Sequence, residues 1–364
     1  MSMQSIRGCL RVFSVTLAIL AMVVSLATQM ASAESRVVIR EIHSDKFDHS
    51  KVGTNPVRKL AVYLPDGYDS AQSRYPVLYY LPSPMDNFQE GFYADTAKKL
   101  LDGAIASGKI APTILAVVDM ATPLGCSWYV NSPVTGNWED FMVQDVVPYV
   151  DSNFKTLSSR DSRGIFGDFM GGYGAIRFGM THPEIFGSVY GLHPVGTGSG
   201  VLTMYSRPNW DNLAHAKSLE DAKADGYSRI FTTIFQAHLP DVDKGPLFID
   251  LQAHTENGHL VIDSKVTARL RDNFFLESLV PKYADNLKSL RGFKFDWARS
   301  DGNQDHVYSN QAFTHKLNEF GIAHEAEEYN GVWQSGNWEE GGRIWTDVLP
   351  FFEVHLVFSG KAKM

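Results

Sequence analysis

The chain has 364 residues, of which 44% are hydrophobic and 20% are charged, and its formal net charge is -8. This length and composition predict a globular protein with a large core and exclude a low-complexity or disordered chain. The acidic balance argues against nucleic acid as a partner.

Residues 1–33 have the pattern of a secretory signal peptide. Arg7 and Arg11 form a basic lead, an apolar run follows from Val12 to Ala27, and Ala31-Ser32-Ala33 offers small residues for cleavage. The apolar run is shorter than the roughly 20 residues that span a bilayer, so a cleaved signal is favoured over a membrane anchor. We therefore expect an exported protein, periplasmic or extracellular, with no membrane span after the signal is removed.

Cys126 is the only cysteine that remains after removal of the signal, which contains Cys9. A lone cysteine cannot form an internal disulfide, even in an oxidising compartment. The stability of the exported protein must therefore come from its core.

From Val57 to about Leu192, short apolar runs alternate with helical stretches. This alternation predicts a mostly parallel sheet that is covered by helices on both faces. The last helix should end near His182, because Pro183 cannot continue it. The expected strands are Lys59–Leu64, Val77–Leu81, Thr113–Val118, Gly164–Phe166 and Ser188–Leu192, and the expected helices are Tyr93–Ile105, Trp138–Phe154 and Gly171–His182.

The chain from Pro194 to Leu287 breaks this alternation with a glycine-rich stretch and mostly helical segments. We interpret it as an insertion over the sheet, so residues 34–364 are expected to form one domain with an insertion at about residues 194–287. After the insertion, we expect a strand at Phe293–Trp297, a loop through Asp305, a helix near Ser309–Phe320, a strand at Glu325–Tyr329 and a final helix from about Gly342 to Leu356.

Residues 162–175 have the pattern of a nucleophile elbow, a sharp turn between a strand and a helix that lifts one side chain above the sheet. Gly167 and Gly171 lie on either side of the central residue and allow the sharp turn and the close approach of strand and helix. The central residue, however, is Phe169, whose ring has no nucleophilic atom and no proton to give.

Seven segments of the chain occur together in one protein family. They are Tyr129–Phe141, Val147–Asp151, Met170–Ala175, His182–Phe186, Tyr283–Leu287, Gly321–Glu325 and Leu349–Phe352. On these segments the chain resembles the esterases related to esterase D and enterochelin esterase, within the α/β-hydrolase superfamily. The resemblance covers nearly the whole chain after the signal. It implies an α/β-hydrolase fold, with a mostly parallel central sheet flanked by helices and a helical insertion over the sheet.

In the resembling esterases an elbow serine attacks an ester carbonyl, a histidine takes its proton, and an aspartate orients the histidine. The resemblance places the serine position on Phe169 and the histidine position on Trp333. It places the acid in the loop 301–305, with Asp305 as the better candidate. No histidine occurs between His324 and His355, so the chain is expected to lack both the serine and the histidine of the usual triad.

A third departure follows the strand Val77–Leu81. The resembling esterases have a His-Gly stretch there, whose backbone N–H helps to hold the oxyanion, whereas this chain has Pro82-Ser83-Pro84-Met85. Pro84 has no N–H to donate, so this oxyanion donor is also expected to be lost.

The side chains around the elbow leave two hypotheses open. The first is a non-catalytic or ligand-binding pseudoesterase that holds a small apolar or ester-like ligand on an aromatic cleft floor made by Phe169 and Trp333. The alternative is a carboxylic-ester hydrolase or acyl-handling enzyme with a rearranged active site, built from Asp168, His193, Asp305 and His306. The possible cleft residues are Ser83, Asp168, Met170, His193 and His306.

Three residues of the rearranged set, Asp168, His193 and His306, are individually weak candidates for catalysis. We expect the Asp168 carboxylate to point beside the pocket, because the glycines of the elbow frame the next residue instead. His193 follows a strand and has no identifiable acid partner in the sequence. His306 is interpreted as a polar loop residue, because it neighbours Asp305 and adjacent side chains on one loop seldom bond each other.

The segment from His254 to His259 contains two histidines and Glu256, which are metal-ligating residue types. Gly258 disfavours a helix that would align the three side chains on one face, so a polar turn before Leu260 is favoured. We therefore expect no metal and no cofactor.

Overall fold

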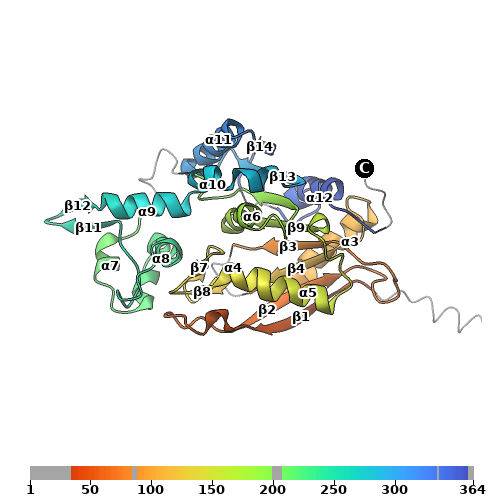
Figure 1. Ribbon diagram of the computed structural model, residues 1–364, viewed down its shortest axis with the longest axis horizontal. Helices are drawn as coiled ribbons and strands as arrows, with labels where there is room; N and C mark the ends of the chain where they lie inside the picture. The colour runs from red at the N-terminus through yellow and green to blue at the C-terminus, as the bar shows by residue number, and fades with distance from the viewer. Residues whose placement is uncertain (1–33, 84–87, 199–206, 334–335, 360–364) are drawn as a thin grey trace, which may run out of the picture.

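A mostly parallel sheet forms the centre of the protein in the computed structural model, which describes residues 34–83, 88–198, 207–333 and 336–359 (Figure 1). Within these residues the sheet has eight strands in the order β1-β2-β4-β3-β9-β10-β13-β14. In this order, the six strands from β4 to β14 run parallel to one another, and β2 is antiparallel to both of its neighbours, β1 and β4. Their bounds are β1 (Arg36–His43), β2 (Val57–Leu64), β3 (Val77–Leu81), β4 (Ile114–Val118), β9 (Arg163–Asp168), β10 (Ser188–Leu192), β13 (Gly292–Ala298) and β14 (Glu325–Tyr329).

The strand predictions are confirmed, with β3, β10 and β14 at the expected bounds. The strand expected at Gly164–Phe166 is longer, because β9 continues to Asp168 at the elbow. The first strand, β1, was not predicted from the sequence. It lies at the edge of the sheet and its side chains are mostly half-buried or exposed, so its place depends on pairing with β2.

Helices cover both faces of the sheet, as the alternation of the sequence predicts. Along β3, Val77, Tyr79 and Leu81 belong to one core, whereas Leu78 and Tyr80 belong to the other. This alternation follows from the two-residue period of a strand, and it makes β3 apolar on both faces. The helices are α2 (Glu90–Phe92), η2 (Tyr93–Ala97), α3 (Lys98–Ala106), α4 (Trp138–Asp140), η3 (Phe141–Val146), α5 (Val147–Asn153), α6 (Met170–Thr181), α11 (Gln304–Glu319), η6 (Ile344–Val348) and α12 (Leu349–His355).

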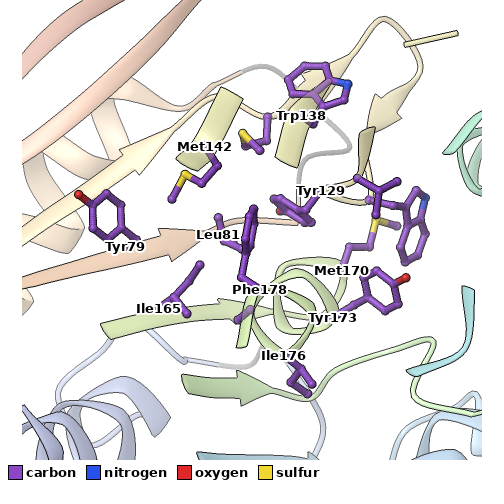
Figure 2. Close-up of a cluster of buried hydrophobic side chains, with 14 of the residues drawn as sticks. Tyr79, Leu81, Tyr129, Trp138, Met142, Ile165, Met170, Tyr173, Ile176 and Phe178 are labelled. Atoms are coloured by element: carbon purple, nitrogen blue, oxygen red, sulfur yellow. The ribbon is translucent and has the colours of Figure 1, made fainter. Parts of the chain in front are cut away.

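The larger core lies between the sheet and α6 (Figure 2). Met170, Tyr173 and Ile176 of α6 are buried there with Leu81 of β3 and Ile165 of β9. Fully burying one such side chain contributes about 1.5–3 kcal/mol to folding, so this packing holds the elbow rigidly on the sheet.

The helix expected near Ser309–Phe320 begins earlier than predicted, at Gln304. Asn303 caps it, because its side-chain oxygen accepts a hydrogen bond from the backbone N–H of Asp305 at 3.3 Å. Asp305 and His306 therefore lie in the first turn of a helix and not in a loop.

The region between Pro194 and Leu287 contains helices and one hairpin, and most of it lies at one end of the molecule, at the left of Figure 1. The hairpin occupies the segment that was expected to be a polar turn before Leu260. Its elements are α7 (Trp210–Ala214), η5 (Leu219–Lys223), α8 (Gly226–His238), β11 (Ala253–Glu256), β12 (His259–Ile262), α9 (Ser264–Phe274) and α10 (Leu276–Lys288).

Short elements complete the described chain. They are the 3-10 turns η1 (Asp45–Phe47) and η4 (Arg160–Ser162) and the two-residue strands β5 (Ala121–Thr122), β6 (Gly125–Cys126), β7 (Asn131–Ser132) and β8 (Gly136–Asn137). Across the described parts of the chain, every helix is too short or too polar to cross a membrane. The signal peptide expected at residues 1–33 lies outside the described residues.

Candidate functional site

The elbow keeps its sharp turn although its central residue is a phenylalanine. Phe169 has φ 57° and ψ -107°, a conformation that non-glycine residues rarely adopt. The turn is held by close packing, since a Cβ on Gly171 would lie 1.8 Å from the Leu81 oxygen and one on Gly167 would lie 2.2 Å from the Gly171 oxygen. Such a backbone costs on the order of 1–3 kcal/mol, which the surrounding core must offset.

The Phe169 ring lies against the ring of Trp333, which follows β14. Their centroids are 4.2 Å apart and their planes differ by 10°, so the two rings are stacked. The ring of His306 meets Phe169 edge-on at 5.2 Å. The structure therefore brings together the two positions that the resemblance assigns to serine and histidine, and an aromatic stack occupies them.

A cluster of two histidines and one carboxylate lies beside this stack. His193 Nε2 is 2.8 Å from Asp301 Oδ2, and His306 Nδ1 is 2.7 Å from the same oxygen. The second oxygen of Asp301 accepts the backbone N–H of Asn303 at 2.8 Å. His193 follows β10, whereas Asp301 follows the neighbouring strand β13, so the order of the strands in the sheet creates the contact.

The hydrogen-bond donors around the cluster define which ring nitrogens carry protons. The backbone N–H of Ala298 donates to His193 Nδ1 at 2.9 Å, so the proton of neutral His193 is on Nε2 and points at Asp301. His306 donates from Nδ1 to Asp301, and its Nε2 faces the Asn303 side-chain amide at 3.0 Å. The unprotonated nitrogen of His306 is therefore Nε2.

These hydrogen bonds hold Asp301 in its charged form. Burial by itself would raise the pKa of Asp301, but the hydrogen bonds from His193, His306 and the Asn303 backbone outweigh burial. The net pKa of Asp301 lies well below the ordinary value for an aspartate. Asp301 thus remains an anion at neutral pH although its side chain is only 4% exposed.

His193 is fixed in place by its backbone as well as by its ring. Its φ is +40°, in the left-handed region, and its N–H donates to the buried Asp296 at 3.2 Å. Arg343 neutralises Asp296 from the other side at 2.8 Å. This support makes His193 a rigid partner for Asp301.

The expectations drawn from the sequence for His193 and His306 need correction. His193 does have an acid partner, and His306 bonds Asp301 and not the adjacent Asp305. The contact between His193 and Asp301 spans 108 positions, so the sequence pattern did not reveal it. The one available signal was that both residues follow the carboxyl ends of strands, which can be neighbours in a sheet.

The ligand atoms of His193, Asp301 and His306 lie within 4.8 Å of one another, a spacing that a metal ion could bridge. The donor pattern does not fit this use. A metal on His193 Nε2 would require the ring proton to move to Nδ1, where it would face the Ala298 N–H. His254, Glu256 and His259 are no better, because all three are exposed on the hairpin β11–β12.

A cavity of about 590 Å³ opens above the stack, between the sheet and the region 194–287. Phe169, Met170 and Trp333 form part of its wall, and Asp305 and His306 supply polar atoms. Its size is that of a small-molecule site. Other lining residues include Trp128, Trp210, Tyr227, Ile230, Phe231, Ile234, Leu260, Ile262, Leu270, Phe274, Phe275, Asp301, Asn303 and Ser309, together with the charged Arg207 and Arg271.

Three of the five expected cleft residues, Ser83, Asp168 and His193, do not line this cavity. Ser83 and Asp168 line a second cavity of about 400 Å³, together with Tyr80 and Trp338. Asp168 therefore does not join His193 and His306 in one constellation. Of the rearranged set proposed from the sequence, only Asp305 and His306 line the cavity above the stack, and His193 is buried and lines neither cavity. Pro84 and Met85 of the expected oxyanion loop lie outside the described residues.

A family model described as "Putative esterase" matches residues 52–339, which include the elbow, both histidines of the cluster and Trp333. The chain belongs to this esterase family. Its α/β-hydrolase fold is therefore the fold that the resemblance implied.

Curated relatives of this esterase-family protein include Esterase Rv1288 of Mycobacterium tuberculosis, which is 29% identical over 212 residues, or 51% of this chain and 44% of that protein. An endo-1,4-beta-xylanase/feruloyl esterase of Xylanibacter ruminicola is 30% identical over 148 residues, or 40% of this chain and 20% of that protein. The chain thus spans less than half the length of the curated relatives it matches.

Solved structures similar to this esterase-family protein include a ferulic acid esterase with a TM-score of 0.60 and 18% identity, covering 89% of this chain and 100% of that one. An S-formylglutathione hydrolase from Agrobacterium tumefaciens has a TM-score of 0.53 and 15% identity, covering 89% of this chain and 96% of that one. At these identities the likeness shows the α/β-hydrolase fold.

Proposed function

We propose that this protein is an exported pseudoesterase that binds a small apolar or ester-like ligand without serine-esterase catalysis. The stack of Phe169 on Trp333 is the observation that carries the proposal. Serine-esterase chemistry needs a hydroxyl at the first position and an imidazole at the second, and neither aromatic side chain supplies one. Removing either group from a comparable triad lowers turnover by about 10⁶.

The cavity supports binding as the remaining role. Its wall is rich in aromatic and aliphatic side chains, and the stacked rings of Phe169 and Trp333 present an apolar surface to it. Such a surface is suited to an apolar group of a ligand. The names of the relatives, esterase and feruloyl esterase, favour an ester-like ligand.

A second candidate function is an ester hydrolase or acyl-handling enzyme with a rearranged active site. One observation favours it, the hydrogen bond between His306 and Asp301 at the cavity wall. A histidine oriented by a carboxylate is the arrangement of a general base. Asp168, which opens to the other cavity, has no part in this version of the rearranged site.

Export rests on the signal pattern of residues 1–33. The test is expression of the full chain in a Gram-negative host, followed by cell fractionation and N-terminal sequencing. We expect the protein outside the cytoplasm and beginning at Glu34. A cytoplasmic protein that keeps residues 1–33 would contradict export.

The experiment for the main proposal measures binding and turnover on the same purified protein. Short-chain aryl esters are titrated against wild type, Trp333→Phe and Trp345→Phe while tryptophan fluorescence is recorded. Quenching that decreases with Trp333→Phe and is unchanged with Trp345→Phe locates the ligand, because Trp345 packs in the opposite core. Some quenching should remain in Trp333→Phe, since Trp128 and Trp210 also line the cavity.

Turnover is then compared between wild type, Phe169→Ser and the double variant Phe169→Ser with Trp333→His. We expect wild type to hydrolyse the esters far below the roughly 1–10³ s⁻¹ of ordinary enzymes. Wild-type turnover within that range would overturn the pseudoesterase, and an absence of quenching at millimolar ester would overturn the ligand-binding role.

A further inference from the structure

His306 is the member of the histidine–carboxylate cluster that reaches the cavity. Its side chain is 20% exposed, whereas those of Asp301 and His193 are 4% and 1% exposed. Asp301 accepts the Nδ1 proton of His306, which leaves the lone pair of the imidazole on Nε2. The cluster therefore has a solvent-facing base and a buried, charged support.

His193 makes that support rigid. Its Nε2–H donates to the same Asp301 oxygen, and the Ala298 N–H prevents its ring from taking the other tautomer. Asp301 is consequently held by three donors, two imidazoles and the Asn303 backbone N–H. A carboxylate held in this way stabilises the imidazolium that forms when His306 takes a proton.

Water is the nucleophile that this geometry favours. Ser309 also lines the cavity, but its hydroxyl donates to the His306 carbonyl oxygen at 3.2 Å and is thereby directed at the backbone. Phe169 has no nucleophilic atom, and Asp168 lines the other cavity. The lone pair of His306 Nε2 accepts an N–H of the Asn303 side-chain amide at 3.0 Å, and an incoming water reaches Nε2 by displacing this donor.

We infer that His306 is a general base that activates water for slow hydrolysis of an aryl ester held on the Phe169–Trp333 stack. The inference rests on the second candidate function above and adds the nucleophile and the roles of the residues. His306 is the catalytic residue, and Asp301 and His193 are positioning residues. The reaction proceeds by direct addition of water, without an acyl-enzyme.

In this reaction His306 takes up one proton and later releases it. Nε2 accepts a proton from water while the water oxygen bonds to the ester carbonyl carbon and the carbonyl electrons move to its oxygen. The carbonyl then re-forms as the bond to the aryloxy oxygen breaks, and the imidazolium returns its proton to that oxygen. The products are a carboxylic acid and a phenol, and His306 is neutral again.

The test measures hydrolysis of 4-nitrophenyl acetate by the full exported protein over a range of pH. Its main variant is His306→Gln, and its matched control is His315→Gln, which alters an exposed histidine on the same helix α11. We expect the enzymatic rate to fall by about 10²- to 10⁴-fold in His306→Gln and to be unchanged in the control. The charged and titratable side chains beside His306 or on the cavity wall are Asp301, His193, Asp305, Arg207 and Arg271.

Changing a positioning residue should affect kcat and KM differently. With Asp301→Asn we expect kcat to fall while KM stays within about twofold, because Asp301 stabilises the charged imidazole and not the bound ester. The pH–rate profile should rise through one ionisation in wild type and become flat in His306→Gln. Free imidazole should restore part of the activity of His306→Ala, which also serves if His306→Gln fails to fold.

Three outcomes would overturn the inference: unchanged hydrolysis in His306→Gln, a burst of 4-nitrophenol with an acetylated protein by mass spectrometry, or no hydrolysis by wild type above buffer. Fluorescence titration on the same samples separates this failure from failure of ligand binding. If wild type binds the ester but does not hydrolyse it, the water-activating base is wrong and the binding proposal stands. If the ester does not bind, the ligand-binding proposal fails as well.

Discussion

Two histidine–carboxylate clusters in this protein are opposite in composition. At the end of α6, the half-buried imidazole of His182 lies between two carboxylates, with Glu139 and Glu184 each at 2.9 Å. Beside the elbow, the buried Asp301 lies between two imidazoles at 2.7 and 2.8 Å. The first cluster lies on the surface of the helix layer, whereas the second opens to a cavity.

The central group therefore favours a different charge in each cluster, positive on His182 and negative on Asp301. Partial burial disfavours a charge on His182, but the hydrogen bonds that its ring donates to Glu139 and Glu184 outweigh burial and raise the pKa of the imidazole. Burial likewise disfavours the Asp301 anion, and hydrogen bonds from the histidines outweigh it and lower the pKa of the carboxyl group. A similar contact therefore forms a surface ion pair in one place and holds the His306 imidazole at the cavity wall in the other.

The largest effect is expected at the cavity, from Asp301→Ala. The change leaves the His193 and His306 N–H groups without their acceptor, and His193 is almost fully buried. An unsatisfied buried donor costs about 1–3 kcal/mol, so we expect the free energy of unfolding at pH 7 to fall by about that amount in urea titrations. Asp305→Ala is the matched control on the same cavity, with an expected loss below about 1 kcal/mol.

The loss of unfolding free energy in Asp301→Ala should depend on pH. Because the folded pKa of Asp301 is depressed, its contribution is complete above the unfolded pKa of about 4 and is lost as pH falls through the folded pKa. The difference in unfolding free energy between wild type and Asp301→Ala should therefore narrow below about pH 4. A difference that grows with acid would contradict the charged carboxylate.

A smaller effect, with the opposite pH dependence, is expected from His182→Gln. The raised pKa of His182 means that its contribution is complete below the unfolded pKa of about 6.5 and is lost as pH rises through the folded pKa. We expect a loss of about 0.2–1 kcal/mol near pH 5.5 that disappears at alkaline pH, measured by urea unfolding across that range. A constant loss at all pH values would mean that packing, and not charge, is responsible.

The smallest effect is expected from Glu184→Gln. The Glu184 side chain is 64% exposed, so its ion pair with His182 is screened by water and salt. We expect a change within about 0.5 kcal/mol at pH 5.5, and a larger one for Glu139→Gln, whose side chain is 17% exposed. Equal losses in the two variants, measured by thermal unfolding, would show that exposure does not distinguish the two carboxylates.

The sequence by itself determined most strands of the central sheet, the elbow and the family. Apolar runs and prolines are local signals, so strands such as β3 and β10 and the end of α6 near His182 could be placed without tertiary information. The elbow was equally readable from the spacing of Gly167 and Gly171, which contact each other within a few residues, although both also approach Leu81 of the neighbouring strand β3. The phenylalanine between them is evident in the sequence, and it raises the question of whether the protein is catalytic.

Only the tertiary structure decided which polar residues meet. His193 and Asp301 are far apart in the chain, and they touch because β10 and β13 are neighbours in the sheet. The cap at Asn303 turns the next residues into a helix and points His306, not Asp305, at that carboxylate. Strand order is set by the packing of the whole chain, so a local pattern could identify the elbow but not the histidine–carboxylate cluster beside it.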